Sequence, residues 1–127
     1  MNTKIILILR IIIAVILVQT LYFKFTAHPD SVFIFSKVGL EPFGRISIGI
    51  LELISAILIL IPRTIWLGSL LTVGLMGGAI MMHLTQLGIE INNDGGALFY
   101  MALGVFSLST FTLLNQRKNI PFIGGKL

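Results

Sequence analysis

The chain contains no cysteine among its 127 residues, and only 11% of its residues are charged. The absence of cysteine excludes disulfides, thiolate metal sites and thiol catalysis by this chain. With 56% hydrophobic residues, the composition also differs from that of a soluble domain, which is about 45 to 50% apolar and about 25% charged. The length leaves room for four membrane spans of about 20 residues each and little else.

Sequence signals for metal binding, nucleic-acid binding and several kinds of catalysis are also missing. EF-hand, HExxH and cysteine-based metal patterns are absent, as are a Gly-rich phosphate loop, a nucleophile elbow and a carboxylate pair at catalytic spacing. The net charge is +4, but the nine Lys and Arg residues are scattered at predicted helix ends and form no basic patch. We therefore expect no nucleic-acid partner and no metal site.

Four apolar runs are each long enough to cross about 30 Å of hydrocarbon. They cover residues 4–25, 44–61, 64–87 and 96–114. The first run continues to Lys24 without a small-residue cleavage site, so we interpret it as a retained span and not as a signal peptide. The chain is therefore predicted to be all-α, a single membrane domain over residues 1–127 built as a transmembrane four-helix bundle.

The connection between the first two spans is predicted to contain a short helix. Residues 28–31 are typical of a turn followed by a helix start, with Asp30 or Ser31 as the N-cap. The apolar segment over residues 31–38 is too short to cross a membrane. It fits a helix that lies at the membrane interface.

The distribution of basic residues predicts the orientation of the bundle. With the N-terminus inside, the basic residues on the inner side are Lys4, Arg63, Arg117, Lys118 and Lys126. Those on the outer side are Lys24, Lys37 and Arg45. The positive-inside rule then places both termini in the cytoplasm. We expect an integral membrane protein of the bacterial inner membrane.

The functional prediction depends on Glu52, which stands in the middle of the second span. A carboxylate at this depth costs roughly 2.5 to 3.5 kcal/mol to insert, so it must face protein, water or a partner. Arg45 and Gly49 lie near the same helix face and form, with Glu52, a stripe expected to face the bundle interior. Glu52 either binds a ligand, a proton or a partner, or it forms a structural pair with Arg45, Lys24 or His83.

Polar side chains of other spans are predicted at the depth of Glu52. With a rise of about 1.5 Å per residue, Gln19, Glu52 and His83 each lie within roughly 7 to 12 Å of the outer boundary. Such a layer predicts an outward-opening polar pocket. The predicted ligand-binding residues are Glu52, His83, Gln19, Arg45, Lys24 and Tyr100.

Two features of the spans concern packing. Gly74 and Gly78 form a GxxxG pattern that allows a second helix to approach closely, and they would also let the bundle form a homo-oligomer. Arg10 in the first span is interpreted as an anchor whose side chain snorkels to the nearer interface.

Several segments together form a pattern that extends over about residues 5–114. They are ILRIIIAVILVQTLYFK with Arg10 and Lys24, the loop to GLEPFGR, Glu52 in ILELISAILILIPR, and His83 at the end of GLMGGAIMMHL. In these segments the chain resembles the DoxX and DoxX-like family of small four-helix membrane proteins.

This resemblance implies a link with membrane redox systems. Family members include small subunits of a terminal quinol oxidase and of thiosulfate:quinone oxidoreductase, and the wider superfamily includes cargo receptors and assembly chaperones. We therefore predict a non-catalytic or accessory subunit of a redox or quinone-linked system, in which the layer around Glu52 binds a small polar or quinone-like ligand or docks a partner helix. The alternatives are a small proton-coupled transporter that protonates Glu52 and a membrane-protein assembly factor.

Overall fold

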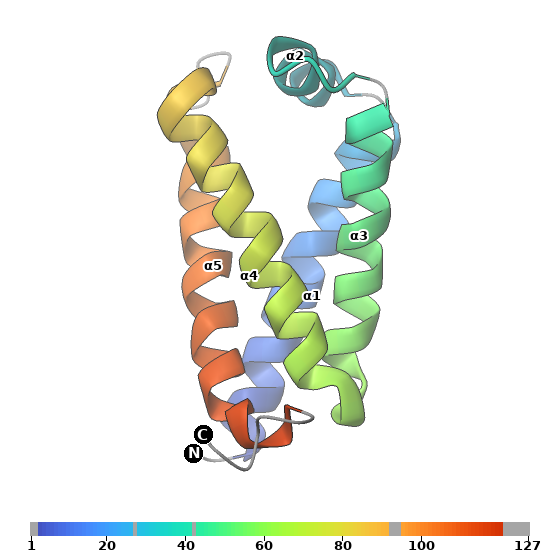
Figure 1. Cartoon of the computed structure of the whole chain (residues 1–127), viewed down its shortest axis with the longest axis vertical. Coiled ribbons are helices and arrows are strands. Elements are labelled where there is room, and N and C mark those ends of the chain that lie inside the picture. The colour runs from blue at the N-terminus through green and yellow to red at the C-terminus, as the bar shows by residue number, and fades with distance from the viewer. Residues whose placement is uncertain (1–2, 27, 42, 92–94, 121–127) are drawn as a thin grey trace.

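The computed structural model describes residues 3–26, 28–41, 43–91 and 95–120 and shows a bundle of long helices (Figure 1). Four segments are long and apolar enough to cross a membrane. They contain the helices α1 (Thr3–Phe25), α3 (Phe43–Leu60), α4 (Ile65–Met82) and α5 (Ala97–Asn115). The described residues contain no strand. The prediction of an all-α transmembrane bundle is confirmed.

Three short helical segments extend the spans. The 3-10 helix η1 (Pro62–Thr64) precedes α4 and the π-helix η2 (His83–Leu87) follows it, so this span has 26 residues in total. The 3-10 helix η3 (Arg117–Asn119) follows α5. Residues 92–94 of the loop before α5, and Lys126, which entered the orientation prediction, lie outside the described residues.

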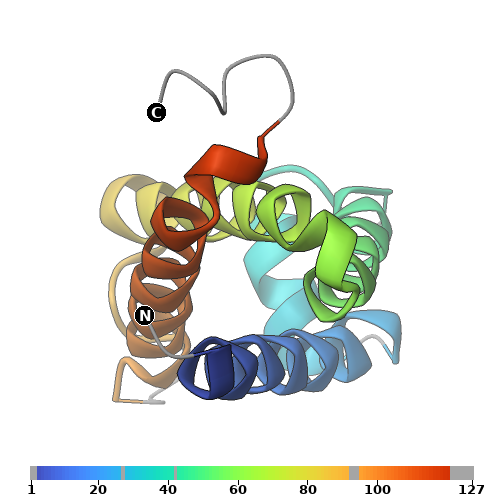
Figure 2. The same ribbon diagram turned by 90° about the horizontal axis from the view of Figure 1, so that it is seen from below.

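The four spans form a ring in the order α1, α5, α4, α3, and each contacts its two neighbours (Figure 2). Helix α1 begins and α5 ends at the same end of the bundle, as an even number of spans requires (Figure 1). We call this end the N-terminal end and the opposite end the α2 end. The side of the membrane on which each end lies stays a prediction.

The short helix α2 (Pro29–Lys37) lies across the α2 end of the bundle (Figure 1). Its N-cap is His28, whose Nδ1 accepts a hydrogen bond from the backbone N–H of Asp30 at 3.2 Å. The prediction of Asp30 or Ser31 as the N-cap is therefore wrong. Pro29 occupies the first helical turn, where its fixed φ favours the helix and its missing N–H costs nothing, so the helix starts earlier than predicted.

An apolar core fills the half of the bundle nearer the N-terminal end. Its buried members are Ile13, Ala14, Leu17, Ala56, Ile59, Ile65 and Val105. Because these side chains come from all four spans, the core joins the whole ring on this side. Buried small residues, such as the fully buried Ser55 and Thr72, let the helices approach closely.

Gly68 marks a close approach of α4 to α3. A Cβ atom added at Gly68 would lie 2.5 Å from the backbone nitrogen of Ile59 and 2.9 Å from its Cα. We expect Gly68→Ala to lower the free energy of unfolding by about 1 to 3 kcal/mol, because backbone atoms cannot rotate away. The matched variant Gly104→Ala meets no atom within 4 Å and should be neutral or slightly stabilising through helix propensity. Unfolding in SDS titrations measures both, and equal stabilities would contradict the prediction.

Candidate functional site

At the α2 end the spans separate and enclose a cavity of about 300 Å³. All four spans line it, and α2 covers it with Ser31, Ile34 and Phe35. Leu17 and Val105, which also belong to the apolar core, close it toward the N-terminal end. The volume lies at the lower end of the range for small-molecule sites, which is about 300 to 1,000 Å³.

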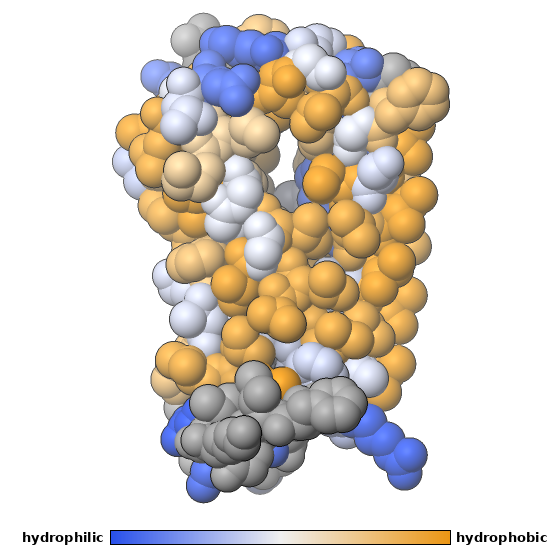
Figure 3. Space-filling view, in the orientation of Figure 1, coloured by the Kyte–Doolittle hydropathy of each residue, from blue (hydrophilic) through white to orange (hydrophobic). Residues whose placement is uncertain are grey.

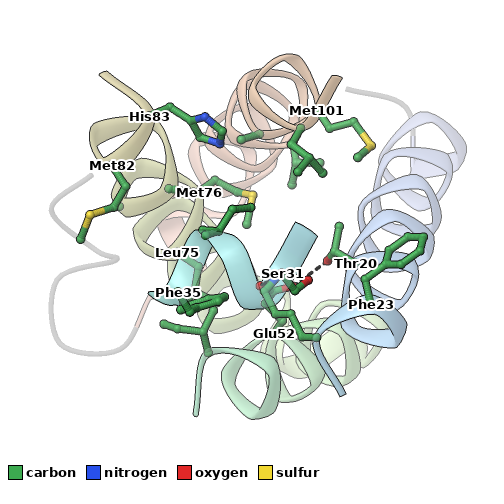
Figure 4. A pocket seen from close by; sticks show the side chains of 18 of the residues that line it. Thr20, Phe23, Ser31, Phe35, Glu52, Leu75, Met76, Met82, His83 and Met101 are labelled. Atoms are coloured by element: carbon green, nitrogen blue, oxygen red, sulfur yellow. Dashed lines mark hydrogen bonds and ion pairs between the residues drawn. The ribbon is translucent and has the colours of Figure 1, made fainter. Parts of the chain in front are cut away.

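Most residues that line the cavity are apolar, including several methionines (Figure 4). The lining residues with polar side chains are Thr20, Lys24, Ser31, Glu52 and His83. A small number of polar groups in an apolar wall is the usual composition of a site that orients a small ligand.

The carboxylate of Glu52 lies in one wall of the cavity, and the residue is 2% exposed. The ammonium of Lys24 lies 2.9 Å from its Oε1, and the hydroxyl of Thr20 donates to its Oε2 at 2.7 Å (Figure 4). Two donors from α1 therefore hold the carboxylate of α3. This pairing compensates a charge that would be costly to bury alone. Of the partners considered from the sequence, Lys24 is the one that the structure gives to Glu52.

The structure brings Thr20 to Glu52 and places Gln19 elsewhere. Gln19 is exposed and does not line the cavity. In a helix, residues five apart point about 140° away from each other, whereas residues four apart differ by about 40°. Thr20 therefore shares the face of Lys24, and Gln19 does not. The polar residue one turn before Lys24 was the signal that could have identified Thr20.

Arg45 is buried beside the site but does not line the cavity. Its Nε donates to both carboxylate oxygens of Glu41, at 2.9 and 3.0 Å. Its Nη1 donates to the backbone carbonyl of Lys24. Arg45 therefore holds the backbone of the residue that pairs with Glu52.

His83 points into the cavity from the wall formed by α4 and η2 (Figure 4). Its Nδ1 lies 2.8 Å from the carbonyl oxygen of Gly88, and the edge of the ring packs against Phe99. Gly88 has a φ of +80°, which favours glycine and ends the helical segment here. Because a carbonyl oxygen only accepts, Nδ1 is the donor in this contact, and in the neutral imidazole Nε2 is left as an acceptor. No described residue donates to Nε2.

Glu52 and His83 thus belong to one cavity, but no hydrogen bond joins them within the described part of the chain. They stand in different walls, with apolar side chains between them (Figure 4). Tyr100 is 60% exposed and does not line the cavity. In the described ranges, no group of three or more His, Asp or Glu side chains is arranged to hold a metal ion.

Residues 8–109 match the DoxX-like family, and this range contains every residue that lines the cavity. The chain belongs to the DoxX-like family. No curated protein and no solved structure matches it. The family match therefore supports a membrane protein, and the chemistry of this DoxX-like protein has to be argued from its own cavity.

The cavity of this DoxX-like protein offers a donor and an acceptor in different walls. Lys24 has three ammonium protons, and among the described residues only the carboxylate of Glu52 lies against that ammonium. Nε2 of His83 is a hydrogen-bond acceptor in the other wall. The arrangement suits a ligand with an apolar body and polar atoms at two ends.

Proposed function

We propose that this DoxX-like protein is an accessory subunit of a membrane redox system and binds a quinone or quinol in the cavity between Glu52 and His83. The observation that carries the proposal is an apolar cavity inside the bundle with polar groups in opposing walls. A quinone ring is apolar on its faces and has oxygen atoms at two opposite positions. Lys24 would donate to one oxygen, and Nε2 of His83 would accept from a hydroxyl at the other.

The roles of the chain's own residues are binding and orientation. Glu52 holds the ammonium of Lys24 at the wall, the hydroxyl of Thr20 holds the other oxygen of Glu52, and Arg45 fixes the backbone of Lys24. Gly88 fixes the tautomer of His83. Electron transfer belongs in this proposal to the partner subunits of the complex.

The closed apolar core favours a ligand-binding function over transport, which needs a continuous path through the bundle. Leu17 and Val105 close the cavity toward the N-terminal end, and Ile13 and Ile59 behind them are fully buried. Proton-coupled transport through Glu52 would require these helices to part along their whole inner half. Flux that disappears in Glu52→Gln, after reconstitution in liposomes, would support that alternative.

The proposal predicts stabilisation by quinone. Purified protein in mild detergent is titrated with a benzoquinone and a naphthoquinone, each with a decyl tail, in the oxidised and the reduced form. A ligand at about 100 times its Kd should stabilise the folded state by about 2.7 kcal/mol and raise the unfolding temperature. The absence of stabilisation by any of them, together with the absence of a copurifying redox subunit, would overturn the proposal.

His83→Leu is expected to weaken the binding of the quinol about tenfold, because the hydroxyl of the quinol loses its acceptor inside an apolar wall. The oxidised quinone lacks that hydroxyl, so its affinity should change much less. Isothermal titration with both forms separates this effect from a general loss of structure. Tyr100→Phe removes a hydroxyl outside the cavity and serves as the matched control with unchanged affinities. An equal loss for both redox forms would contradict the role of Nε2.

A further inference from the structure

The cavity continues to the membrane-facing surface of the bundle. Figure 3 shows a hollow below α2, where Figure 1 shows α4 diverging from α3. Gly74 and Gly78 line the cavity and are nevertheless exposed. The cavity therefore reaches from the bundle interior to the outer face of α4.

Gly74 and Gly78 differ from the other glycines of α4. A Cβ atom at Gly68 would meet Ile59 of α3, and one at Gly77 would meet Phe106 of α5. At Gly74 and Gly78 it would meet no atom within 4 Å. The GxxxG pattern therefore packs against no described helix of this chain, although close helix approach was the expectation from the sequence. Gly74 and Gly78 leave a strip of α4 without side chains beside the opening.

The rim of the opening is apolar. Ile48 of α3 and Leu75 and Met82 of α4 line the cavity on this side. An opening of this composition between two membrane spans faces hydrocarbon, and water would gain no hydrogen bonds there.

We infer that the ligand of this cavity carries a long aliphatic chain, which leaves the bundle between α3 and α4 and lies over Gly74 and Gly78. The inference rests on the proposed function for the ring and adds the class of ligand: a lipid with an isoprenoid or alkyl tail, which enters from the bilayer.

Two observations besides the glycines support this occupant. The cavity of about 300 Å³ gives room for a ring but not for a long tail, so a tail has to continue outside. The ring of His83, a residue that is 5% exposed, points into the same cavity (Figure 4), and its Nε2 has no hydrogen-bond partner in the described part of the chain. It marks the position of one polar atom on the ring of a ligand whose tail lies at the opening.

The test replaces Gly74 and Gly78 with leucine, alone and together. Both side chains would enter open space, so the variants should fold, and they would occupy the path of the tail. The control is Gly104→Leu on α5, which also meets open space and lies outside the cavity. The probes are a benzoquinone with a decyl tail and the same ring without the tail, both measured by isothermal titration.

We expect the double variant to bind the decyl-tailed probe at least tenfold more weakly, and the affinity for the tail-less ring to fall much less, because the two positions lie at the opening of the cavity. Gly104→Leu should bind both probes like the original protein. An unchanged affinity of the double variant for the decyl-tailed probe would overturn the inference and leave the proposed function standing. A change in oligomeric mass in the double variant, with tail affinity unchanged, would instead assign the strip to contact with a second copy. Failure of the unmodified protein to bind either probe would reject the proposed function itself.

Discussion

Glu52→Leu is expected to lower the free energy of unfolding by about 3 to 5 kcal/mol, which is the range for breaking a buried ion pair from one side. The variant leaves the ammonium of Lys24 in the cavity wall without its counter-charge. The hydroxyl of Thr20 loses its contact with Glu52 and keeps only the backbone carbonyl of Leu17 as an acceptor, at 2.9 Å. The effect comes from the uncompensated charge more than from the lost attraction between the two groups.

The double variant Lys24→Met/Glu52→Leu should therefore be more stable than Glu52→Leu alone, because no charge remains buried. SDS unfolding of the two single variants and the double variant forms a double-mutant cycle that isolates the coupling between the two side chains. Glu90→Leu replaces an exposed glutamate that accepts one long hydrogen bond, from the backbone N–H of Gly95 at 3.3 Å, and should cost less than about 1 kcal/mol. A double variant as unstable as Glu52→Leu alone would show that the pair is not the source of the loss.

The same double variant distinguishes a purely structural role of the pair between Glu52 and Lys24 from a role in quinone binding. If Glu52 were only a structural pair, the apolar replacement would keep quinone binding, since the cavity would remain. Under the proposed function, the double variant folds but loses the donor at Lys24, and its affinity for the oxidised quinone should fall. This comparison decides between the two alternatives that the sequence leaves open.

The spans could be predicted from the sequence because membrane insertion constrains both length and hydropathy. The interior position of Glu52 followed from the same argument, since a carboxylate cannot face lipid at low cost. Its pairing with Lys24 instead of Arg45 could not be predicted, because both cations are expected near the same end of the bundle, one on α1 and one on α3. The choice depends on how α1 and α3 are rotated against each other, and local spacing in one helix does not contain that rotation.

Depth in the membrane alone assigned some side chains to the cavity wrongly. Gln19 and Glu52 lie at similar depth, but depth does not determine direction, and the structure turns Gln19 outward and Thr20 inward. Gly74 and Gly78 matched a helix-packing pattern, yet the divergence of α4 from α3 leaves them open to the cavity. That divergence depends on the packing of whole helices, which a local motif does not report.

Arg10 is the second residue whose substitution we expect to lower stability strongly. The interpretation of Arg10 from the sequence is wrong. Arg10 was expected to snorkel to the interface, but it is 7% exposed, and its guanidinium reaches α3. Its Nε donates to the carbonyl of Ile59 at 2.7 Å and its Nη2 to that of Leu60 at 2.8 Å. These are among the last carbonyls of α3, which have no partner within the helix.

Pro62 explains why α3 needs this contact. Proline has no N–H, so it cannot donate to the carbonyl of Leu58 in the preceding turn. The hydroxyl of Thr64 donates a hydrogen bond to that carbonyl at 2.8 Å, and the backbone N–H of Thr64 donates to the carbonyl of Ile61 at 3.0 Å. Arg10 donates to the two remaining carbonyls, those of Ile59 and Leu60. The carbonyls of Leu58, Ile59 and Leu60 thus all have donors at the end of α3, where an unsatisfied buried carbonyl costs about 1 to 3 kcal/mol.

Arg10→Met is therefore expected to lower the free energy of unfolding by about 2 to 4 kcal/mol, since it removes two charge-assisted hydrogen bonds and leaves two carbonyls without donors. Arg10→Lys should lose less, because one ammonium can reach a single carbonyl but lacks the planar fork. Arg63→Met, at an exposed arginine of the same end, should change little. Because Arg10 does not line the cavity, folded Arg10→Met should bind quinone with unchanged affinity. A loss of affinity without a loss of stability would contradict the assignment of Arg10 to the end of α3.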